Sequence, residues 1–294
     1  MHFAGGVDAA SSRMIHSAFA IIALLGCISS SAYYLLCMLG AMAFLRKREA
    51  GLGARSSPAQ LPVSILKPLK GVDPDIYESF RSHCLQDYPE YEIIFGVSDA
   101  NDRAVASVLR LQQEFPDHAI RLVVCEKILG TNVKVSNLAQ MLPQARYENL
   151  VVNDSDIRVE RDYLACVNAP LADERVGMVT CLYRGIAAST VGSQLESLGI
   201  SADFIPGVLA ARQLEGGIRF ALGSTLAFRR TDLSRIGGFE SILDFLADDY
   251  ELGKRIADLG LKVQLSGVVV ETHLPAYSMH GFLSHQLRWA RGVR

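Results

Sequence analysis

The sequence has no excess of charge of either sign. Its 294 residues carry 29 Lys and Arg against 31 Asp and Glu, which gives a formal net charge of −2. Nucleic-acid-binding proteins usually show a basic excess, so we expect no nucleic acid among the partners. The chain also lacks a G-x-G-x-x-G fingerprint, which leaves dinucleotide chemistry with little support. It contains no internal repeat and no low-complexity tract.

Cysteines are few and scattered, with no C-x-x-C pair among the six. This spacing argues against a zinc site and against a disulfide framework. We therefore expect small buried thiols in a reducing compartment. The six are Cys27, Cys37, Cys84, Cys125, Cys166 and Cys181. Three histidines near the C-terminus, His273, His280 and His285, do not form a convincing metal-binding set either.

One long stretch near the N-terminus has no charged residue. It covers residues 17–45, and the cations Arg46-Lys47-Arg48 follow it directly. About 20 apolar residues span a bilayer, so the stretch predicts a transmembrane helix. The positive-inside rule then places residues 1–16 outside the cytosol and the rest of the chain inside. A cleaved signal peptide is the main alternative, although its apolar region would be shorter and would follow its basic residues. A buried helix of a soluble protein is the other alternative.

The remainder of the chain divides into three segments. Residues 46–62 form a basic and polar linker with Gly and Pro, residues 63–278 a globular domain, and residues 279–294 a basic, aromatic segment. Short apolar strands alternate with helical patterns up to residue 153, which predicts a parallel, right-handed α/β sheet. Beyond Asp156 the order is less regular. Strands are expected at 63–66, 91–97, 120–124, 149–153, 176–182, 225–228 and 262–265, and helices at 75–86, 103–115, 133–141 and 249–259.

Acidic residues follow two of these strands. Asp99 comes after the strand at 91–97, and Asp154 and Asp156 come after the strand at 149–153. The carboxyl ends of strands line the ligand crevice of an open α/β sheet. In an extended segment the side chains of residues i and i+2 project to one face, so both carboxylates can reach one ligand. The pair suits Mg²⁺ or Mn²⁺ bound to a nucleotide diphosphate, although most D-x-D sequences are solvated turns or helix caps.

A second acidic pair, Asp248-Asp249, precedes a helical pattern. Transfer of a sugar to an alcohol requires removal of the hydroxyl proton, and a positioned carboxylate can act as that general base. Two adjacent carboxylates can raise each other's pKa by like-charge repulsion. The alternative, equally well supported by the residues alone, is that one of the two is a helix N-cap.

The segment 279–294 contains the pair Arg288-Trp289. An Arg fork can clamp a departing diphosphate, and an indole can stack on a sugar or on an apolar acceptor. The segment also fits an amphipathic helix at a membrane interface, and both functions can coexist on one helix. Lys134 and Asn137, on the predicted helix at 133–141, are further polar candidates for a phosphate site.

Together these residues resemble the ceramide glucosyltransferase-like family of membrane glycosyltransferases, over roughly residues 63–294. The matching segments are LKPLKGVDP (66–74), QDYPEYEIIFGVSDAND (86–102), NVKVSNL (132–138), NDSDIRV (153–159) and ADDYELGKRIADLG (247–260). The family's last motif begins with Gln or Arg three residues before Arg-Trp, where this chain has His285. Finer features resemble the bacterial hopanoid-associated members; they are TCLYRG (180–185), DFIPGVLAAR (203–212) and FALGSTLAFRR (220–230).

The resemblance implies an inverting glycosyltransferase with a GT-A fold, a UDP-sugar donor and Mg²⁺ or Mn²⁺. Asp99 would contact the uridine, Asp154 and Asp156 the diphosphate and metal, and Asp249 would be the base. Lys134, Arg288 and Trp289 would also contact the nucleotide-sugar, with Asp248, Asn137 and His285 in support. The acceptor would be a membrane lipid such as ceramide, diacylglycerol or a hopanoid, and the location the bacterial inner membrane. Family members usually continue into further membrane helices, so a truncation at residue 294 is expected.

Two other functions remain open. A processive polysaccharide synthase shares the layout of aspartates and Arg-Trp but needs a translocating helix bundle, and only one anchor is visible in this sequence. A non-catalytic membrane protein that binds nucleotide-sugars is the second alternative. The intact set of Asp99, Asp154, Asp156 and Asp249 argues against a decayed site.

Overall fold

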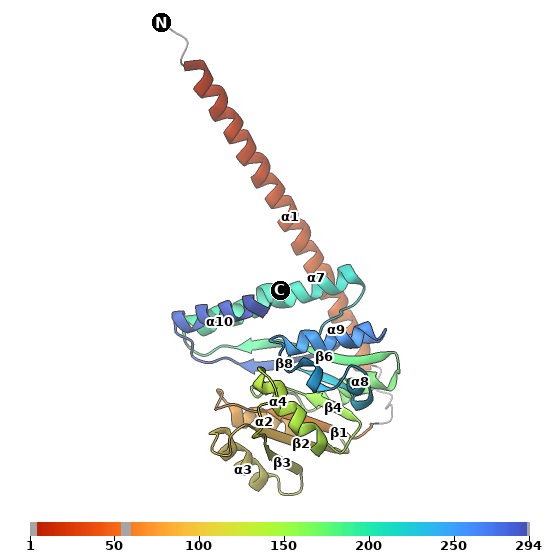
Figure 1. Cartoon of the computed structure of the whole chain (residues 1–294). Coiled ribbons are helices and arrows are strands. Elements are labelled where there is room, and N and C mark those ends of the chain that lie inside the picture. Colours follow the sequence, from red (N-terminus) through yellow and green to blue (C-terminus); the bar gives the residue numbers. More distant parts are fainter. Residues whose placement is uncertain (1–4, 54–59, 293–294) are drawn as a thin grey trace.

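The computed structural model describes residues 5–53 and 60–292 (Figure 1). Within these residues one mixed sheet of eight strands has the order β3-β2-β1-β4-β7-β6-β8-β5. Its strands are β1 (Val63–Pro68), β2 (Tyr91–Val97), β3 (Ala119–Val124), β4 (Asn149–Val152), β5 (Ile157–Arg158), β6 (Val176–Ile186), β7 (Leu226–Arg229) and β8 (Lys262–His273).

Helices cover the sheet and continue toward the N-terminus. They are α1 (Gly5–Gly53), α2 (Ile76–Cys84), α3 (Ala104–Glu114), α4 (Val133–Met141), α5 (Tyr163–Asn168), α6 (Val191–Gly199), α7 (Ile205–Glu215), α8 (Arg230–Arg235), α9 (Asp248–Asp258) and α10 (Met279–Gly292). A π-helical turn, η3 (Ile200–Phe204), joins α6 to α7, and 3₁₀ turns lie at η1 (Leu142–Gln144), η2 (Ala169–Ala172) and η4 (Phe239–Ile242).

The sheet is α/β, as the sequence predicts, but it is not parallel throughout. The strands β3, β2, β1 and β4 are parallel to one another. By contrast, β7 is antiparallel to both β4 and β6, and β5 is antiparallel to β8. The predicted parallel arrangement is therefore confirmed for the strands up to residue 152. The antiparallel pairs all involve strands beyond Asp156, where the sequence pattern is less regular.

The core lies on both faces of the sheet. Successive side chains of a strand point to opposite faces, so β1 contributes to two clusters. Ile65 packs in the cluster that holds Phe80 of α2, and Leu66 packs in the cluster that holds Leu138 of α4. All four side chains are fully buried. Helices thus sandwich the parallel half of the sheet and hold its carboxyl edge in place.

The N-terminal helix is longer than the predicted span of residues 17–45. It runs without a break from Gly5 to Gly53 and projects from the globular part (Figure 1). Residues 13–46 are long and apolar enough to cross a membrane. The helix continues through the first part of the predicted linker because Arg, Lys, Glu and Ala are strong helix formers. Residues 54–59 of that linker lie outside the described residues.

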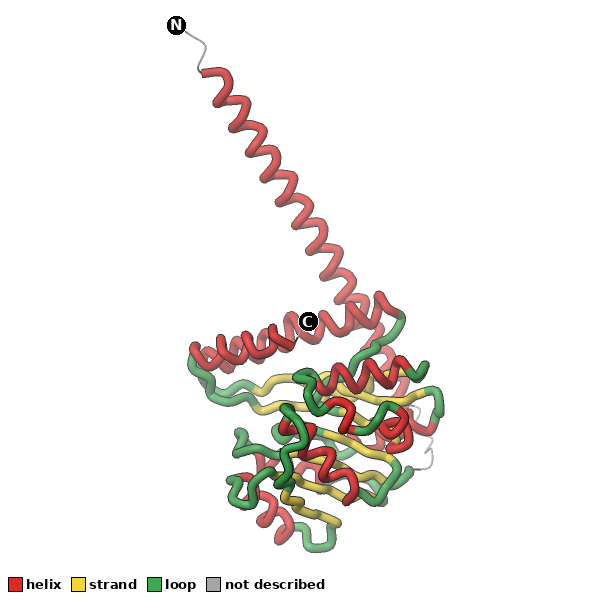
Figure 2. Tube along the Cα trace, viewed as in Figure 1, coloured by secondary structure: helices red, strands yellow, loops and turns green. Residues whose placement is uncertain are grey.

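The base of α1 packs against α7. Cys37 and Phe44 are buried there, while most of α1 between residues 13 and 35 is exposed. A Cβ built on Gly40 would lie 2.8 Å from the carbonyl oxygen of Leu209 on α7, so only glycine permits this close approach. The helix α7 crosses the lower part of α1 (Figure 2), whose end also contacts β8 of the sheet, while α10 packs against α6. Of the six cysteines, Cys27 on α1 is exposed and Cys166 half-buried, so the expectation of buried thiols holds for the other four.

Candidate functional site

Buried polar side chains hold the turn after β4 in place through hydrogen bonds. Asn153 is fully buried, and its Nδ2 donates to the carbonyl oxygen of Ser224 at 2.7 Å and to the hydroxyl of Tyr163 at 2.9 Å. Lys67, at the end of β1, is also fully buried, and its Nζ donates to the carbonyl oxygen of Asp154 at 2.9 Å. These contacts fix the backbone from which Asp154 projects.

Lys134 joins this turn to the start of α9. Asn132 caps α4 by accepting a hydrogen bond from the amide of Val135, and its Nδ2 donates to the carbonyl oxygen of Phe245 at 2.8 Å. The cap therefore also ties α4 to the segment that leads into α9. As a result, Lys134 Nζ lies 2.8 Å from Asp154 Oδ1 and 3.0 Å from Asp248 Oδ2.

Asp249 is held by two backbone amides. Its Oδ2 accepts a hydrogen bond from Gly223 at 2.7 Å, and its Oδ1 accepts one from Tyr250 at 2.8 Å. The N-cap of α9 is Ala247, without a side-chain cap, so neither aspartate has the capping role that the sequence allowed. Both lie in the first turn, where the helix dipole favours negative charge.

Three functional side chains converge beside Gly223. A Cβ built on this glycine would lie 3.0 Å from Asp154 Oδ2, 3.3 Å from Asp249 Oδ2 and 3.7 Å from Lys134 Nζ. The site thus requires a residue without a side chain at this position. Acidic groups that are far apart in the sequence meet here around one ammonium group.

The charges in this cluster perturb one another. Burial raises the pKa of Asp249, the charge of Lys134 lowers it, and the charges of Asp248 and Asp154 raise it further. The pKa of Lys134 stays well above its usual value although burial alone would lower it, because Asp154, Asp248 and Asp249 surround it. Lys134 is therefore a cation at neutral pH.

Asp156 has a different environment from Asp154. Its Oδ2 accepts a hydrogen bond from the hydroxyl of Thr272 on β8. Burial raises the pKa of Asp156 to about 6, and the charge of Asp154 adds to the shift. Burial lowers the pKa of Lys67 to about 7, against the charges of Asp156, Asp154 and Asp73. Near the D-x-D turn, burial thus moves the pKa values of a carboxyl group, Asp156, and of an ammonium group, Lys67, toward neutrality.

The donor set around this turn fits a divalent cation. Two carboxylates follow one strand, and the repulsion that raises the pKa of Asp156 is the kind that a bound cation relieves. Within residues 5–53 and 60–292 no group of three or more His, Cys, Asp or Glu side chains is gathered for a metal. Mg²⁺ and Mn²⁺ at phosphate sites need only one or two carboxylates, because phosphate and water oxygens complete their shells.

Asp99 and Asn137 lie near one another at the end of β2. Asp99 is exposed, and its Oδ1 accepts a hydrogen bond from the amide of Asn101 at 2.9 Å. Asn137 is buried on α4, and its Oδ1 accepts from the hydroxyl of Ser98 at 3.0 Å. The strand β1 lies between β2 and β4 in the sheet. Asp99, which follows β2, and Asp154, which follows β4, are therefore two strands apart along the carboxyl edge of the sheet. Asn137 supports the loop, and within the described residues its side chain has no hydrogen bond with Lys134, Asp154 or Asp249.

The Arg-Trp pair lies on α10, and Trp289 belongs to a chain of aromatic contacts. The Trp289 ring centroid is 5.3 Å from that of His285 and 5.9 Å from that of Phe204, and Phe204 is 5.1 Å from Tyr183. Burial raises the pKa of Tyr183, and the charges of Asp249 and Asp154 add to this effect. Arg288 is exposed and has no hydrogen bond or ion pair with any described residue.

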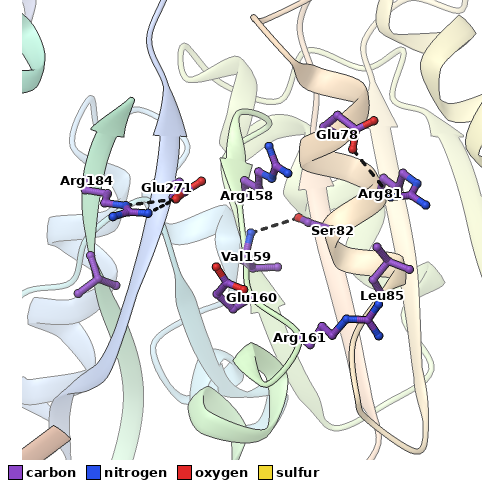
Figure 3. A pocket seen from close by; sticks show the side chains of 11 residues that line it. Glu78, Arg81, Ser82, Leu85, Arg158, Val159, Glu160, Arg161, Arg184 and Glu271 are labelled. Carbon is purple, nitrogen blue, oxygen red and sulfur yellow. Dashed lines mark hydrogen bonds and ion pairs between the residues drawn. The ribbon is translucent and has the colours of Figure 1, made fainter. Parts of the chain in front are cut away.

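A separate cavity of about 510 Å³ lies between α2, β5, β6 and β8 (Figure 3). Arginines and glutamates line it, and several of them pair within its wall. Arg184 forms an ion pair with Glu271, and Arg81 lies 4.0 Å from Glu78. None of the aspartates of the cluster lines this cavity. This cavity is therefore separate from the cluster of Asp154, Asp249 and Lys134.

Several residues of the site region carried no signal in the sequence. Lys67 stands out only as a lysine inside an apolar strand, and Gly223 only as one glycine among 24. Tyr183, Phe204 and Thr272 enter through tertiary contacts that no local pattern indicates. Glu196, described below, belongs to the same group.

The fold is that of the GT-A glycosyltransferases. The mannosyltransferase PcManGT from Pyrobaculum calidifontis, solved in complex with GDP-Man and Mn²⁺, matches with a TM-score of 0.64 and 24% sequence identity. The match covers 89% of this chain and 72% of that chain. The predicted GT-A type of α/β fold is thereby confirmed.

The chain belongs to glycosyl transferase family 21, whose model matches residues 22–294. Among curated relatives, ceramide glucosyltransferase 1 of Caenorhabditis elegans is 23% identical over 93% of this chain and 58% of its own length. Ceramide glucosyltransferase 3 of the same organism is 24% identical over 78% of this chain and 50% of its own length. The ceramide glucosyltransferase-like resemblance is confirmed. The chain spans about half the length of these relatives, and its finer likeness to hopanoid-associated enzymes stays a prediction.

Proposed function

We propose that this chain transfers a hexosyl or N-acetylhexosaminyl group from a UDP-sugar to the hydroxyl of a membrane lipid, with inversion at the anomeric carbon. The observation that carries the proposal is the convergence of Asp154, Asp249 and Lys134 beside Gly223. It joins the D-x-D turn after β4 to the acidic pair of α9. The ceramide glucosyltransferase relatives support a lipid acceptor such as ceramide. A hopanoid is the other acceptor proposed, from the resemblance of residues 180–185, 203–212 and 220–230.

Asp249 acts as the general base in this proposal. Two backbone amides orient its carboxylate, and its raised pKa makes it a better proton acceptor than an ordinary aspartate. The proton of the acceptor hydroxyl moves to Asp249 while the hydroxyl oxygen bonds to the anomeric carbon and the bond to the UDP oxygen breaks. A single displacement of this kind inverts the configuration.

Asp154 and Asp156 would hold Mg²⁺ or Mn²⁺ together with the diphosphate of the donor. The bound cation would offset the negative charge that develops on the leaving UDP. Lys134 supplies a fixed positive charge beside the same turn. Asp99 would contact the uridine, and Arg288 and Trp289 would approach the diphosphate and sugar from α10.

The helices next to α1 form the membrane-facing side of the proposed enzyme. Large apolar side chains are exposed on α6, α7 and α10; they are Leu195, Leu198, Leu214, Leu283 and Leu287. Of these helices, α7 crosses the lower part of α1 (Figure 2), and α10 packs against α6. An interfacial helix buries its apolar face among lipid headgroups. We infer that α1 anchors the chain in the bacterial inner membrane, and that residues 279–294 lie at its cytosolic interface.

Calorimetric titration of UDP with Mn²⁺ tests the proposal. The wild-type chain in detergent should bind UDP, and the double variant Asp154→Ala, Asp156→Ala should lose most of that affinity. A double variant of two exposed acids away from the cluster, Asp117→Ala with Glu126→Ala, is the matched control and should bind like the wild type. Unchanged affinity in the Asp154, Asp156 variant would refute the assignment.

A further inference from the structure

A buried carboxylate is paired with a histidine outside the carboxylate cluster. Glu196 of α6 is 1% exposed. Its Oε1 lies 3.0 Å from Nδ1 of His285, and its Oε2 accepts a hydrogen bond of 2.7 Å from Nε2 of Gln286. His285 stands at the first position of the last motif, where the sequence departs from the Gln or Arg of similar proteins. A buried charge without a partner is costly, so this pairing explains why Glu196 is tolerated inside the fold.

The carboxylate determines which ring nitrogen of His285 carries the proton. An ionised carboxylate can only accept hydrogen bonds, so Nδ1 must be the donor to Glu196. Burial lowers the pKa of His285; the charge of Glu196 opposes this shift, and that of Arg288 reinforces it. The ring is therefore neutral at neutral pH, and its Nε2 carries a lone pair that accepts a hydrogen bond. Among the described residues, no donor is bonded to this Nε2.

The surroundings of the ring resemble a binding surface for a hydroxylated ring or headgroup. The His285 ring stacks on Tyr277 at 5.3 Å between centroids and lies 5.3 Å from Trp289. Aromatic faces of this kind pack against the C–H faces of ligands while a polar group binds their hydroxyls. The contacts continue from Trp289 through Phe204 to Tyr183 of β6. Burial raises the pKa of Tyr183, and the charges of Asp249 and Asp154 add to this effect.

We propose that the Glu196–His285 pair binds a substrate hydroxyl, with Nε2 of His285 as the acceptor of its hydrogen bond. This proposal rests on the proposed function. The hydroxyl is not the one that reacts, because the reacting hydroxyl gives its proton to Asp249. It belongs either to the donor sugar or to the acceptor headgroup, and these two sources share the same chemistry. Glu196 is a positioning residue, since it acts only through the tautomer and orientation of His285.

Four single variants separate this role from a packing role. His285→Phe keeps an aromatic ring between Tyr277 and Trp289 but removes both nitrogens. His285→Gln restores a hydrogen-bond acceptor through its amide oxygen. Glu196→Gln keeps the shape of the side chain and removes its charge. Gln286→Ala is the matched control, because it removes the other hydrogen bond to Glu196 and leaves His285 in place.

Binding of UDP and of UDP-glucose with Mn²⁺, and the KM for a short-chain ceramide in vesicles, are measured for each variant. If the hydroxyl is on the sugar, His285→Phe weakens UDP-glucose binding about 3- to 10-fold, the usual effect of one hydrogen bond, and leaves UDP binding unchanged. If it is on the acceptor, both affinities hold and the KM for ceramide rises by a similar factor. In either case Glu196→Gln has a smaller effect than His285→Phe, because its amide oxygen can still accept from Nδ1 of His285. His285→Gln and Gln286→Ala stay near the wild type.

Two results would overturn the inference while the proposed function stands. One is wild-type affinity and KM in His285→Phe, and the other is an equal loss of UDP and UDP-glucose binding in all four variants, as a packing defect predicts. Nitrogen-15 NMR of the imidazole in the full chain gives an independent check, since a proton on Nε2 contradicts the pairing. A wild-type chain that binds no UDP overturns the proposed function and this inference together.

Discussion

At the scale of single residues, Asp248 and Asp249 are adjacent in sequence but have different partners. Asp248 is 6% exposed and pairs with the ammonium of Lys134. The carboxylate of Asp249 instead accepts hydrogen bonds from the amides of Gly223 and Tyr250. Its Oδ2 and the Oδ2 of Asp154 both lie next to Gly223. In the proposed mechanism this geometry favours Asp249 as the proton acceptor, while Asp248 balances the charge of Lys134.

The first prediction follows from this difference. Asp249→Asn should lower kcat by about 10²- to 10⁴-fold, because a general base contributes a factor of that size. Its UDP-sugar affinity should stay near the wild-type value, since the diphosphate is held elsewhere. Asp248→Asn should be milder, and steady-state kinetics with both substrates checks both variants. Loss of turnover in Asp248→Asn together with near wild-type kcat in Asp249→Asn would reverse the assignment.

The second prediction concerns the pH dependence of kcat/KM. A base works only when deprotonated, so kcat/KM should fall as the pH drops through the pKa of Asp249, which burial raises above the usual aspartate value of about 4. The charge of Asp248 raises this pKa and that of Lys134 lowers it. The acid limb should therefore move to lower pH in Asp248→Asn and to higher pH in Lys134→Met. Shifts in the same direction in both variants would contradict the charge argument.

The acidic candidates were predictable from the sequence because they follow strands, and strand ends are readable from apolar runs. The support around them was not. Lys67 binds a carbonyl oxygen and Gly223 donates an amide proton, and these contacts arise only when β1 and the segment before β7 approach the turn after β4. Residue type indicates which chemistry is available, while the partners of each residue depend on the topology.

At the scale of elements, strong periodic segments were predictable and interrupted ones were not. The helices predicted at 75–86, 103–115, 133–141 and 249–259 correspond to α2, α3, α4 and α9 within a few residues. The α6–η3–α7 segment carried no such signal, because Gly192, Gly199 and Pro206 interrupt its apolar period. That segment contains α7, against which α1 packs, and it also contains Glu196 and Phe204.

The third prediction tests the contact between α1 and α7. Gly40→Leu should lower the thermal stability, since its Cβ would lie 2.8 Å from the Leu209 carbonyl oxygen and overpacking costs about 1–3 kcal/mol. Each kcal/mol corresponds to a Tm change of about 2–4 °C in a chain of this size. Gly26→Leu on the same helix is the matched control, because no atom lies within 4 Å of its built Cβ. Equal Tm values for the two variants in detergent would rule out a close contact at Gly40.

At the scale of the whole molecule, the anchor and the sheet place the site relative to a membrane. The helices α7 and α10 lie between the sheet and the projecting part of α1 (Figure 1). Their exposed leucines therefore lie on helices that separate the sheet from the part of α1 long and apolar enough to cross a membrane. In the proposed function, a lipid hydroxyl would reach Asp249 from the membrane, and the soluble donor would enter from the cytosol.

The last prediction is the orientation of the chain in the bilayer. The cationic run Arg46-Lys47-Arg48 follows the apolar stretch, and Arg13 alone precedes it, so the positive-inside rule places the domain in the cytosol. In a variant without native cysteines, Ser12→Cys should react with an impermeant maleimide added to spheroplasts. Ser56→Cys and Asp117→Cys should react only after lysis or in inverted vesicles. A cytosolic domain also has direct access to a nucleotide-sugar made in the cytosol, so labelling of position 56 or 117 from outside intact spheroplasts would contradict both the topology and the proposed route of the donor.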